Sequence, residues 1–122
     1  MSNPNGRPQQ PDKNLTLSAV DLAWLAGLLE GEVWFGVQHN NSGTSMTQRV
    51  NLAMTDRDVV ERAAGLMGGK IETCRRPPFK NIYRIQLSGA NARSVMRVVR
   101  PLMGRRRSSR IDEIMAISEK HS

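Results

Sequence analysis

Two glutamates close a short apolar segment, and their type and spacing make them candidate metal ligands. Glu30 and Glu32 end the sequence LAGLLEGE of residues 25–32, in which the other residues are apolar or glycine. Carbonyl groups at a helix C-terminus carry partial negative charge, so a carboxylate there needs a compensating charge. A divalent cation would supply that charge.

The residues before the glutamates predict the helix that positions them. Ser18 is a preferred N-cap residue and Asp21 follows three positions later, so we expect a helix from residue 19 to about residue 30. This helix would place Glu30 and Glu32 at its C-terminal end.

Small residues recur on one face of this helix. Ala23, Gly27 and Gly31 are four residues apart, which leaves a stripe without side-chain bulk. An interior glycine costs about 1 kcal/mol relative to alanine, so we expect a close neighbour to offset it. That neighbour is either a strand of the same fold or a second helix. The apolar run of residues 22–29 is too short to cross a bilayer, which takes about 20 residues.

Positive charge dominates the composition and is unevenly distributed. Lys and Arg number 18 against 11 Asp and Glu, a net charge of +7. No acidic residue lies between Thr73 and Ile111 or from Val33 to Thr55. This pattern favours a nucleic-acid partner, although a generic anionic surface stays open. The first acid-free stretch contains Arg75, Arg76, Lys80, Arg84, Arg93, Arg97, Arg100, Arg105, Arg106, Arg107 and Arg110.

The remaining composition indicates one domain in a reducing compartment. Residues 1–14 are rich in Asn, Pro and Gln and are expected to form a disordered tail, neither a signal peptide nor an anchor, before a single domain at residues 15–120. The lone Cys74 cannot form an internal disulfide, so a cytoplasmic or organellar location is expected and secretion is not. Cys74, His39 and His121 lack the spacing of a zinc site.

Periodicity after the first helix predicts two hairpins and three further helices. Strands are expected at residues 33–40 and 46–54, a helix at 56–67, strands at 70–76 and 81–87, and helices up to residue 100 and from 105 to about 118. The result is an α+β chain in the order α-β-β-α-β-β-α-α. Alternation in both hairpins separates an inward face of Val50, Leu52, Met54, Tyr83, Ile85 and Leu87 from an outward face of Thr47, Arg49, Asn51, Ile82, Arg84 and Gln86.

This order, with the octet at the end of the first helix, resembles the LAGLIDADG homing endonuclease family. The resemblance covers nearly the whole chain after the tail. It includes Trp24 before the octet, TDRDVV at residues 55–60, GGKI at 68–71, YRIQLSG at 83–89 and PLMGRRR at 101–107.

The resemblance implies a fold, a partner and a reaction. The four-stranded antiparallel sheet is expected to form half of a saddle over DNA, and a chain with one motif is expected to act as a homodimer. Ala23, Gly27 and Gly31 would then lie at the dimer interface, and the two Glu32 carboxylates would converge and bind Mg2+, with Mn2+ as a substitute. Bound metal would support hydrolysis of double-stranded DNA. No membrane and no small-molecule substrate are expected.

Matching the motif assigns roles to four residues. Glu32 takes the place of the metal-binding catalytic acid, and Glu30 takes a capping or packing role. Asp56 matches a polar position that helps to orient water, although Thr55 and Asp56 also read as a helix N-cap. Arg106 matches a basic position near the scissile phosphate, although it is also one of several exposed arginines in a run.

The outward positions of the hairpins are candidates for contacts with bases and phosphates. Arg, Asn and Gln suit base edges in the major groove, and Lys mostly binds phosphates. Each residue is also compatible with ordinary exposed strand surface. The candidates are Gln38, Asn40, Thr47, Arg49, Asn51, Lys70, Arg76, Arg84 and Gln86.

The chain departs from the family directly after the octet. The family has glycine and a small residue where this chain has Val33 and Trp34. Trp34 could stack on nucleic acid, narrow the central pocket or mark a weakened nuclease. Two functions therefore stay open: a Mg2+-dependent, sequence-specific DNA endonuclease, and a protein of the same fold that binds DNA or intron RNA without cutting, as a maturase or regulator. A general RNA-binding protein fits less well, since aromatic residues make up only 4%.

Overall fold

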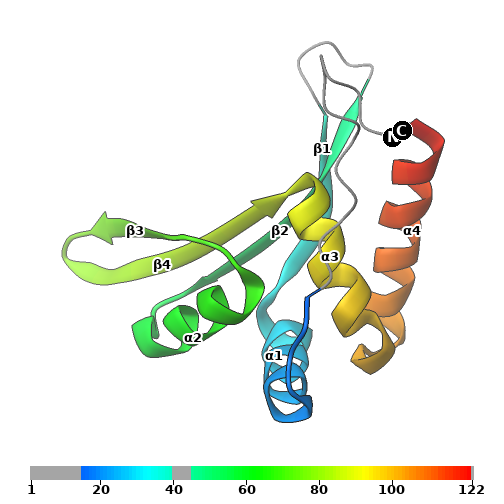
Figure 1. Ribbon diagram of the computed structural model, residues 1–122. Coiled ribbons are helices and arrows are strands. Elements are labelled where there is room, and N and C mark those ends of the chain that lie inside the picture. Colours follow the sequence, from blue (N-terminus) through cyan, green and yellow to red (C-terminus); the bar gives the residue numbers. More distant parts are fainter. Residues whose placement is uncertain (1–14, 40–44, 122) are drawn as a thin grey trace, which may run out of the picture.

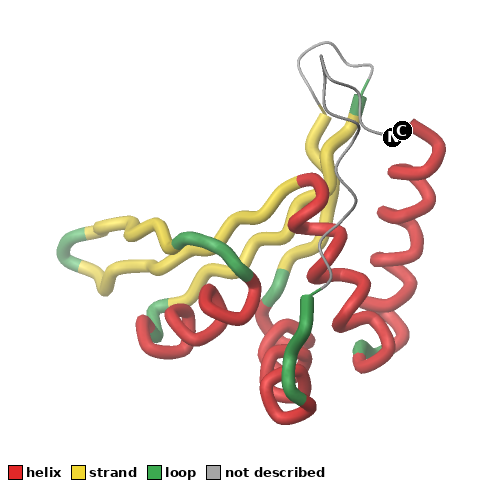
Figure 2. The backbone as a smooth tube through the Cα atoms, viewed as in Figure 1, coloured by secondary structure: helices red, strands yellow, loops and turns green. Residues whose placement is uncertain are grey.

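The computed structural model describes residues 15–39 and 45–121 of the chain. Its elements follow the predicted order α-β-β-α-β-β-α-α (Figures 1 and 2). They are α1 (Ala19–Glu32), β1 (Trp34–His39), β2 (Met46–Met54), α2 (Arg57–Met67), β3 (Ile71–Arg76), β4 (Phe79–Ser88), α3 (Gly89–Val99), the 3-10 turn η1 (Arg100–Leu102) and α4 (Arg105–His121). The tail expected at residues 1–14 lies outside the described residues, as does Asn40.

The four strands form one antiparallel sheet in the order β1-β2-β4-β3. The sheet is curved, and the helices pack against one of its faces (Figure 1). The two hairpins meet where β2 pairs with β4, with Val50 opposite Leu87 and Leu52 opposite Ile85. The predicted α+β fold is confirmed.

The core fills the space between the helices and the inner face of the sheet. Val50, Leu52 and Ile85 from the strands are fully buried, as are Leu25 and Leu29 from α1. Val50 and Leu52 are two residues apart on β2, so the residues next to each of them point to the opposite face of the sheet. Among the residues that the structure describes, no helix covers that second face (Figure 1).

The observed element ends differ from the predicted ones for local reasons. α1 continues to Glu32, so both glutamates belong to the helix, and Ser18 accepts a hydrogen bond from the Asp21 amide at its start. β4 begins at Phe79 instead of residue 81, which shortens the second turn to two residues. α3 ends at Val99, where Pro101 forces a 3-10 turn because proline has no amide hydrogen.

Candidate nucleic-acid interface and helix-end carboxylates

Polar side chains line the open face of the sheet in regular rows. Antiparallel pairing sets Thr47 opposite Gln38 and Asn51 opposite Gln86. Arg84 lies opposite Ala53 on the same face. This face can therefore present amide and guanidinium groups together over three neighbouring strands, which is the arrangement that base and phosphate contacts need.

Two other candidates lie at the margins of the face. Lys70 is exposed just before β3. Arg76 ends β3, and its guanidinium donates to the Lys80 carbonyl at 3.3 and 3.1 Å while it lies 5.9 Å from the centre of the Phe79 ring. Arg76 thus holds the tip of the second hairpin together.

Two features of the open face were missed in the sequence. Arg49 donates a hydrogen bond to the Gln38 side chain, so these two candidates act as one unit. Glu72 of β3 lies opposite Arg84 in the β3–β4 register and brings a negative charge onto the same face. Successive residues of a strand point to opposite faces, so Glu72, between Ile71 and Thr73, could have been assigned to the open face from the sequence.

The structure divides the basic stretch between two surfaces. Arg93 of α3 donates at 2.7 Å to Gln48, which is buried on the inner side of the sheet. Arg100 makes two hydrogen bonds to Asp112, at 2.7 and 2.8 Å, and they hold the pKa of the Asp112 carboxyl below its usual value. These arginines belong to the helical side and add nothing to the open face.

Glu30 has a structural partner, as its predicted capping role requires. Its carboxylate accepts a hydrogen bond of 2.5 Å from the Gly104 amide, just before α4, and lies 3.4 Å from Nε of Arg107. The N-terminus of a helix carries partial positive charge and stabilises a carboxylate. The charge at this position is therefore balanced within the chain by Arg107 and the α4 N-terminus, without a metal ion.

Arg107 clamps the C-terminal end of α1. Its side chain is 12% exposed and donates to the carbonyls of Glu30 at 2.6 Å and Val33 at 2.7 Å. Arginine side chains near a helix C-terminus satisfy carbonyls that have no partner within the helix. In the sequence, nothing separates Arg107 from the neighbouring arginines.

Glu32 differs from Glu30 because it is exposed at the last residue of α1. No cluster of three or more His, Cys, Asp or Glu residues that could hold a metal occurs in residues 15–39 and 45–121. One chain therefore offers Glu32 as a single carboxylate and not as a complete set of ligands.

Asp56, also assigned to catalysis, follows the end of β2. The register sets Trp34 opposite Asn51, so Asp56 lies five residues beyond the position on β2 that faces the start of β1. Asp56 occupies the N-cap position of α2, yet its side chain makes no capping hydrogen bond. Its exposed carboxylate is thus available to a ligand.

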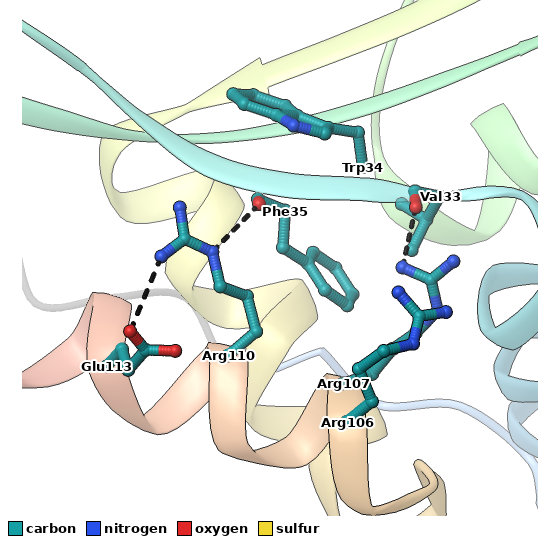
Figure 3. Close-up of a pocket in the computed structure, with 7 residues that line it drawn as sticks. All are labelled: Val33, Trp34, Phe35, Arg106, Arg107, Arg110 and Glu113. Atoms are coloured by element: carbon teal, nitrogen blue, oxygen red, sulfur yellow. Dashed lines mark hydrogen bonds and ion pairs between the residues drawn. The ribbon is translucent and has the colours of Figure 1, made fainter.

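Arg106 is exposed in the first turn of α4 and borders a hollow of about 350 Å³ (Figure 3). Arg110 on the next turn donates to the Phe35 carbonyl at 3.4 Å and lies 3.8 Å from Glu113. The hollow is lined by Val33, Trp34, Phe35, Arg106, Arg107, Arg110 and Glu113.

Val33 and Trp34, which depart from the family pattern, have different environments. Val33 is 5% exposed and belongs to the core. The indole of Trp34 points away from the Arg106, Arg107 and Arg110 side chains, on the other side of β1 (Figure 3). Trp34 therefore belongs to the open face of the sheet.

The stripe of small residues on α1 is open in this chain. Ala23, Gly27 and Gly31 are exposed, and a Cβ added at either glycine would meet no atom within 4 Å. The interpretation that this stripe packs on a strand of the same chain is wrong for the described residues. Val20, three residues before Ala23, is 74% exposed.

No helix in the described part of the chain combines the length and the apolar character needed to cross a membrane.

No family model matches the chain, and no curated protein matches it. Solved structures do match. The homing endonuclease I-CvuI in complex with its target in the presence of 2 mM Ca has a TM-score of 0.63 at 13% identity, over 81% of this chain and 66% of the other. The intron-encoded homing endonuclease I-CeuI complexed with DNA has a TM-score of 0.63 at 13% identity, over 85% and 56%.

A second I-CvuI complex, with the I-CreI target uncleaved in 2 mM Mg, has a TM-score of 0.60 at 12% identity, over 81% of this chain and 66% of the other. The chain thus spans less than two thirds of the length of these proteins. Its architecture is theirs, which confirms the fold predicted from the resemblance.

Proposed function

We propose that this chain, which has the LAGLIDADG homing endonuclease fold, is a member of that family and cuts double-stranded DNA at a specific sequence as a homodimer. The observation that carries the proposal is the contrast between the two helix-end glutamates. Glu30 is held by Gly104 and Arg107, whereas Glu32 is exposed and lies two residues before Trp34 of the open face. The proteins of similar fold were solved with DNA.

The open stripe on α1 supports the homodimer. Two copies of α1 related by a two-fold axis could pack closely through Ala23, Gly27 and Gly31, because no atom of the described chain occupies the space above the glycines. The stripe ends at Gly31, so this packing would bring the two Glu32 residues together. Each chain would then contribute one half of the dimer interface and one Glu32.

The chemistry of the donors fits a hard divalent cation. Two carboxylates at close range repel each other unless a cation or a proton intervenes. Mg2+ prefers carboxylate, phosphate and water oxygens, and Mn2+ accepts the same ligands. The metal, when bound, would activate water and stabilise the leaving oxygen. Glu32 would hold it.

Asp56 and Arg106 would complete the site through their own side chains. The Asp56 carboxylate, which does not cap α2, would accept a hydrogen bond from the attacking water and orient it. The exposed Arg106 guanidinium would pair with the phosphate that is cut. Register and specificity would come from the open face, with Gln38, Arg49, Asn51, Arg84 and Gln86 toward the bases.

The decisive experiment is cleavage of a randomised duplex library in Mg2+. We expect the wild-type protein to cut a subset of sequences and Glu32→Gln to bind the same subset without cutting. Glu61→Gln is the matched control, because Glu61 is an exposed glutamate on α2 that forms an ion pair with Arg57. Cleavage by Glu32→Gln at the wild-type rate would refute the assigned metal ligand.

A second candidate is a protein of this fold that binds DNA or intron RNA without cutting, as a maturase or regulator. Trp34 favours it, because a bulky side chain stands two residues after Glu32 where the family has a small one. Tight, salt-dependent binding of one duplex or RNA with no cleavage in Mg2+ or Mn2+ would establish this function.

A further inference from the structure

Trp34 is an unusual residue on the open face of the sheet. Its neighbours across the strands, Asn51 and Gln86, are polar, whereas Trp34 is a large apolar side chain that is 49% exposed. Exposed aromatic rings on an otherwise polar sheet are typical stacking surfaces for nucleobases.

The lack of a side chain at Gly36 leaves room for the Trp34 ring. A Cβ added at Gly36 would lie 2.2 Å from two carbon atoms of the Trp34 six-membered ring. The indole therefore extends along β1, over the place where the next outward side chain would stand. Because the backbone of Gly36 supports the ring, Trp34 is held in place before any ligand arrives.

The residue opposite Trp34 carries an acceptor that lacks a donor. Asn51 pairs with Trp34 across β1 and β2, and its Oδ1 atom is buried with no hydrogen-bond partner among the described residues. Buried polar atoms are nearly always paired, so this oxygen needs a donor that the described residues do not supply. Arg49, opposite Gly36, is already bonded to Gln38.

We infer that Trp34 stacks on an unstacked nucleobase of the bound DNA and that Asn51 hydrogen-bonds to the edge of that base. This inference rests on the proposed function, because it requires that DNA lie on the open face. Base pairs in intact duplex present polar edges to a protein, and their flat faces become accessible only where a step is unstacked. The site therefore binds duplexes that unstack readily next to the position of Glu32.

The inference makes Trp34 a determinant of specificity. Pyrimidine–purine steps such as TA and CA are the most easily unstacked. Sequences that the wild-type protein selects from a randomised duplex library should carry such a step at their centre. Replacing that step by GG should weaken wild-type binding about tenfold or more and should change binding by Trp34→Leu much less.

The two tryptophans of the chain allow a direct test with a matched control. Trp24 lies on α1 with its ring 4.1 Å from the Arg62 guanidinium, away from the open face. In Trp24→Phe, Trp34 is the fluorophore, and saturating selected duplex should quench its emission. In Trp34→Phe, Trp24 is the fluorophore, and its emission should stay unchanged.

The duplex affinities of two Trp34 variants distinguish stacking of the ring on a base from apolar packing of the side chain. Trp34→Leu keeps apolar bulk over Gly36 but cannot stack, so we expect about tenfold to a hundredfold weaker binding of the selected duplex. Trp34→Phe should stay within about threefold of wild type, and both variants should melt near the wild-type temperature because the side chain is half exposed.

The outcomes distinguish this inference from the proposed function. If the wild-type protein retains no duplex, the proposed function is wrong and the inference falls with it. If the selected duplex binds but the Trp34 emission is unchanged, or Trp34→Leu binds as tightly as wild type, only the inference is overturned. Preference for single-stranded DNA or RNA over the duplex would overturn the proposed function, and the inference would fall with it.

Discussion

Nε of Arg107 donates to the backbone carbonyl of Glu30 at 2.6 Å, although the two residues are 77 positions apart in the chain. This bond and the Gly104–Glu30 hydrogen bond tie the start of α4 to the end of α1. The position of Glu32 is therefore determined by a contact with the last helix. α4 therefore helps to position Glu32, although its Arg107 side chain lies on the helical side of the sheet.

The clamp predicts that two adjacent arginines differ in their effect on stability. Arg107→Ala should lower the free energy of unfolding by about 2–4 kcal/mol, because it leaves the Glu30 and Val33 carbonyls without their donors. Arg106→Ala, at an exposed position, should change it by less than about 0.5 kcal/mol. Urea denaturation of both variants measures this difference, and equal losses would contradict the clamp.

The two helix-end glutamates should respond in opposite ways to the same substitution. Glu30→Gln should cost about 1 kcal/mol of stability, because it removes the charge that faces the α4 N-terminus and Arg107. It should still support cleavage below its melting temperature. Glu32→Gln should keep wild-type stability and lose cleavage. Thermal melting together with a cleavage assay tests both, and a reversed pattern would exchange their assigned roles.

The open stripe on α1 predicts a variant that loses its partner without losing its fold. Gly27→Leu should be a monomer, because its side chain would fill the open space where the proposed homodimer would pack a second α1. Its own helix should gain up to about 1 kcal/mol from the loss of glycine.

Gly65→Leu on α2 is the control for the stripe. Gly65 is also exposed, and a Cβ there meets no atom within 4 Å. This variant should stay dimeric by light scattering. A dimeric Gly27→Leu would place the interface elsewhere.

The Arg100–Asp112 ion pair predicts a small pH dependence of stability. The hydrogen bond from Arg100 lowers the pKa of Asp112 from its ordinary value of 3.8. A carboxyl group with a lowered pKa stabilises the fold above its unfolded pKa and loses this contribution as the pH falls through its folded pKa. Asp112→Asn should therefore melt below wild type at neutral pH, and the gap should close as the pH falls below 3.8. A gap that is constant with pH would show that the charge is irrelevant.

Much of the fold was predictable because it depends on local patterns. The alternation of Val50 and Leu52 with Arg49 and Asn51 sorts the two faces of β2 wherever the strand lies. The N-cap Ser18 and the helix-ending Gly68, with φ 78°, mark element ends by their own chemistry. The start of β4 was missed by two residues, because a hairpin turn of two or four residues fits the same composition.

The sequence by itself determined the order of the elements, the polar face and the presence of two acids at a helix end, since each follows from residue periodicity and chain order. Only the tertiary structure decided that the Glu30 carboxylate binds the N-terminal end of α4 and that Glu32 is exposed. The Glu30–Gly104 contact joins residues 74 positions apart, and no local pattern encodes such a pairing. The same packing places Arg93, Arg100 and Arg107 on the helical side of the sheet. Arginines on the two faces carry the same charge, so charge alone does not assign a face.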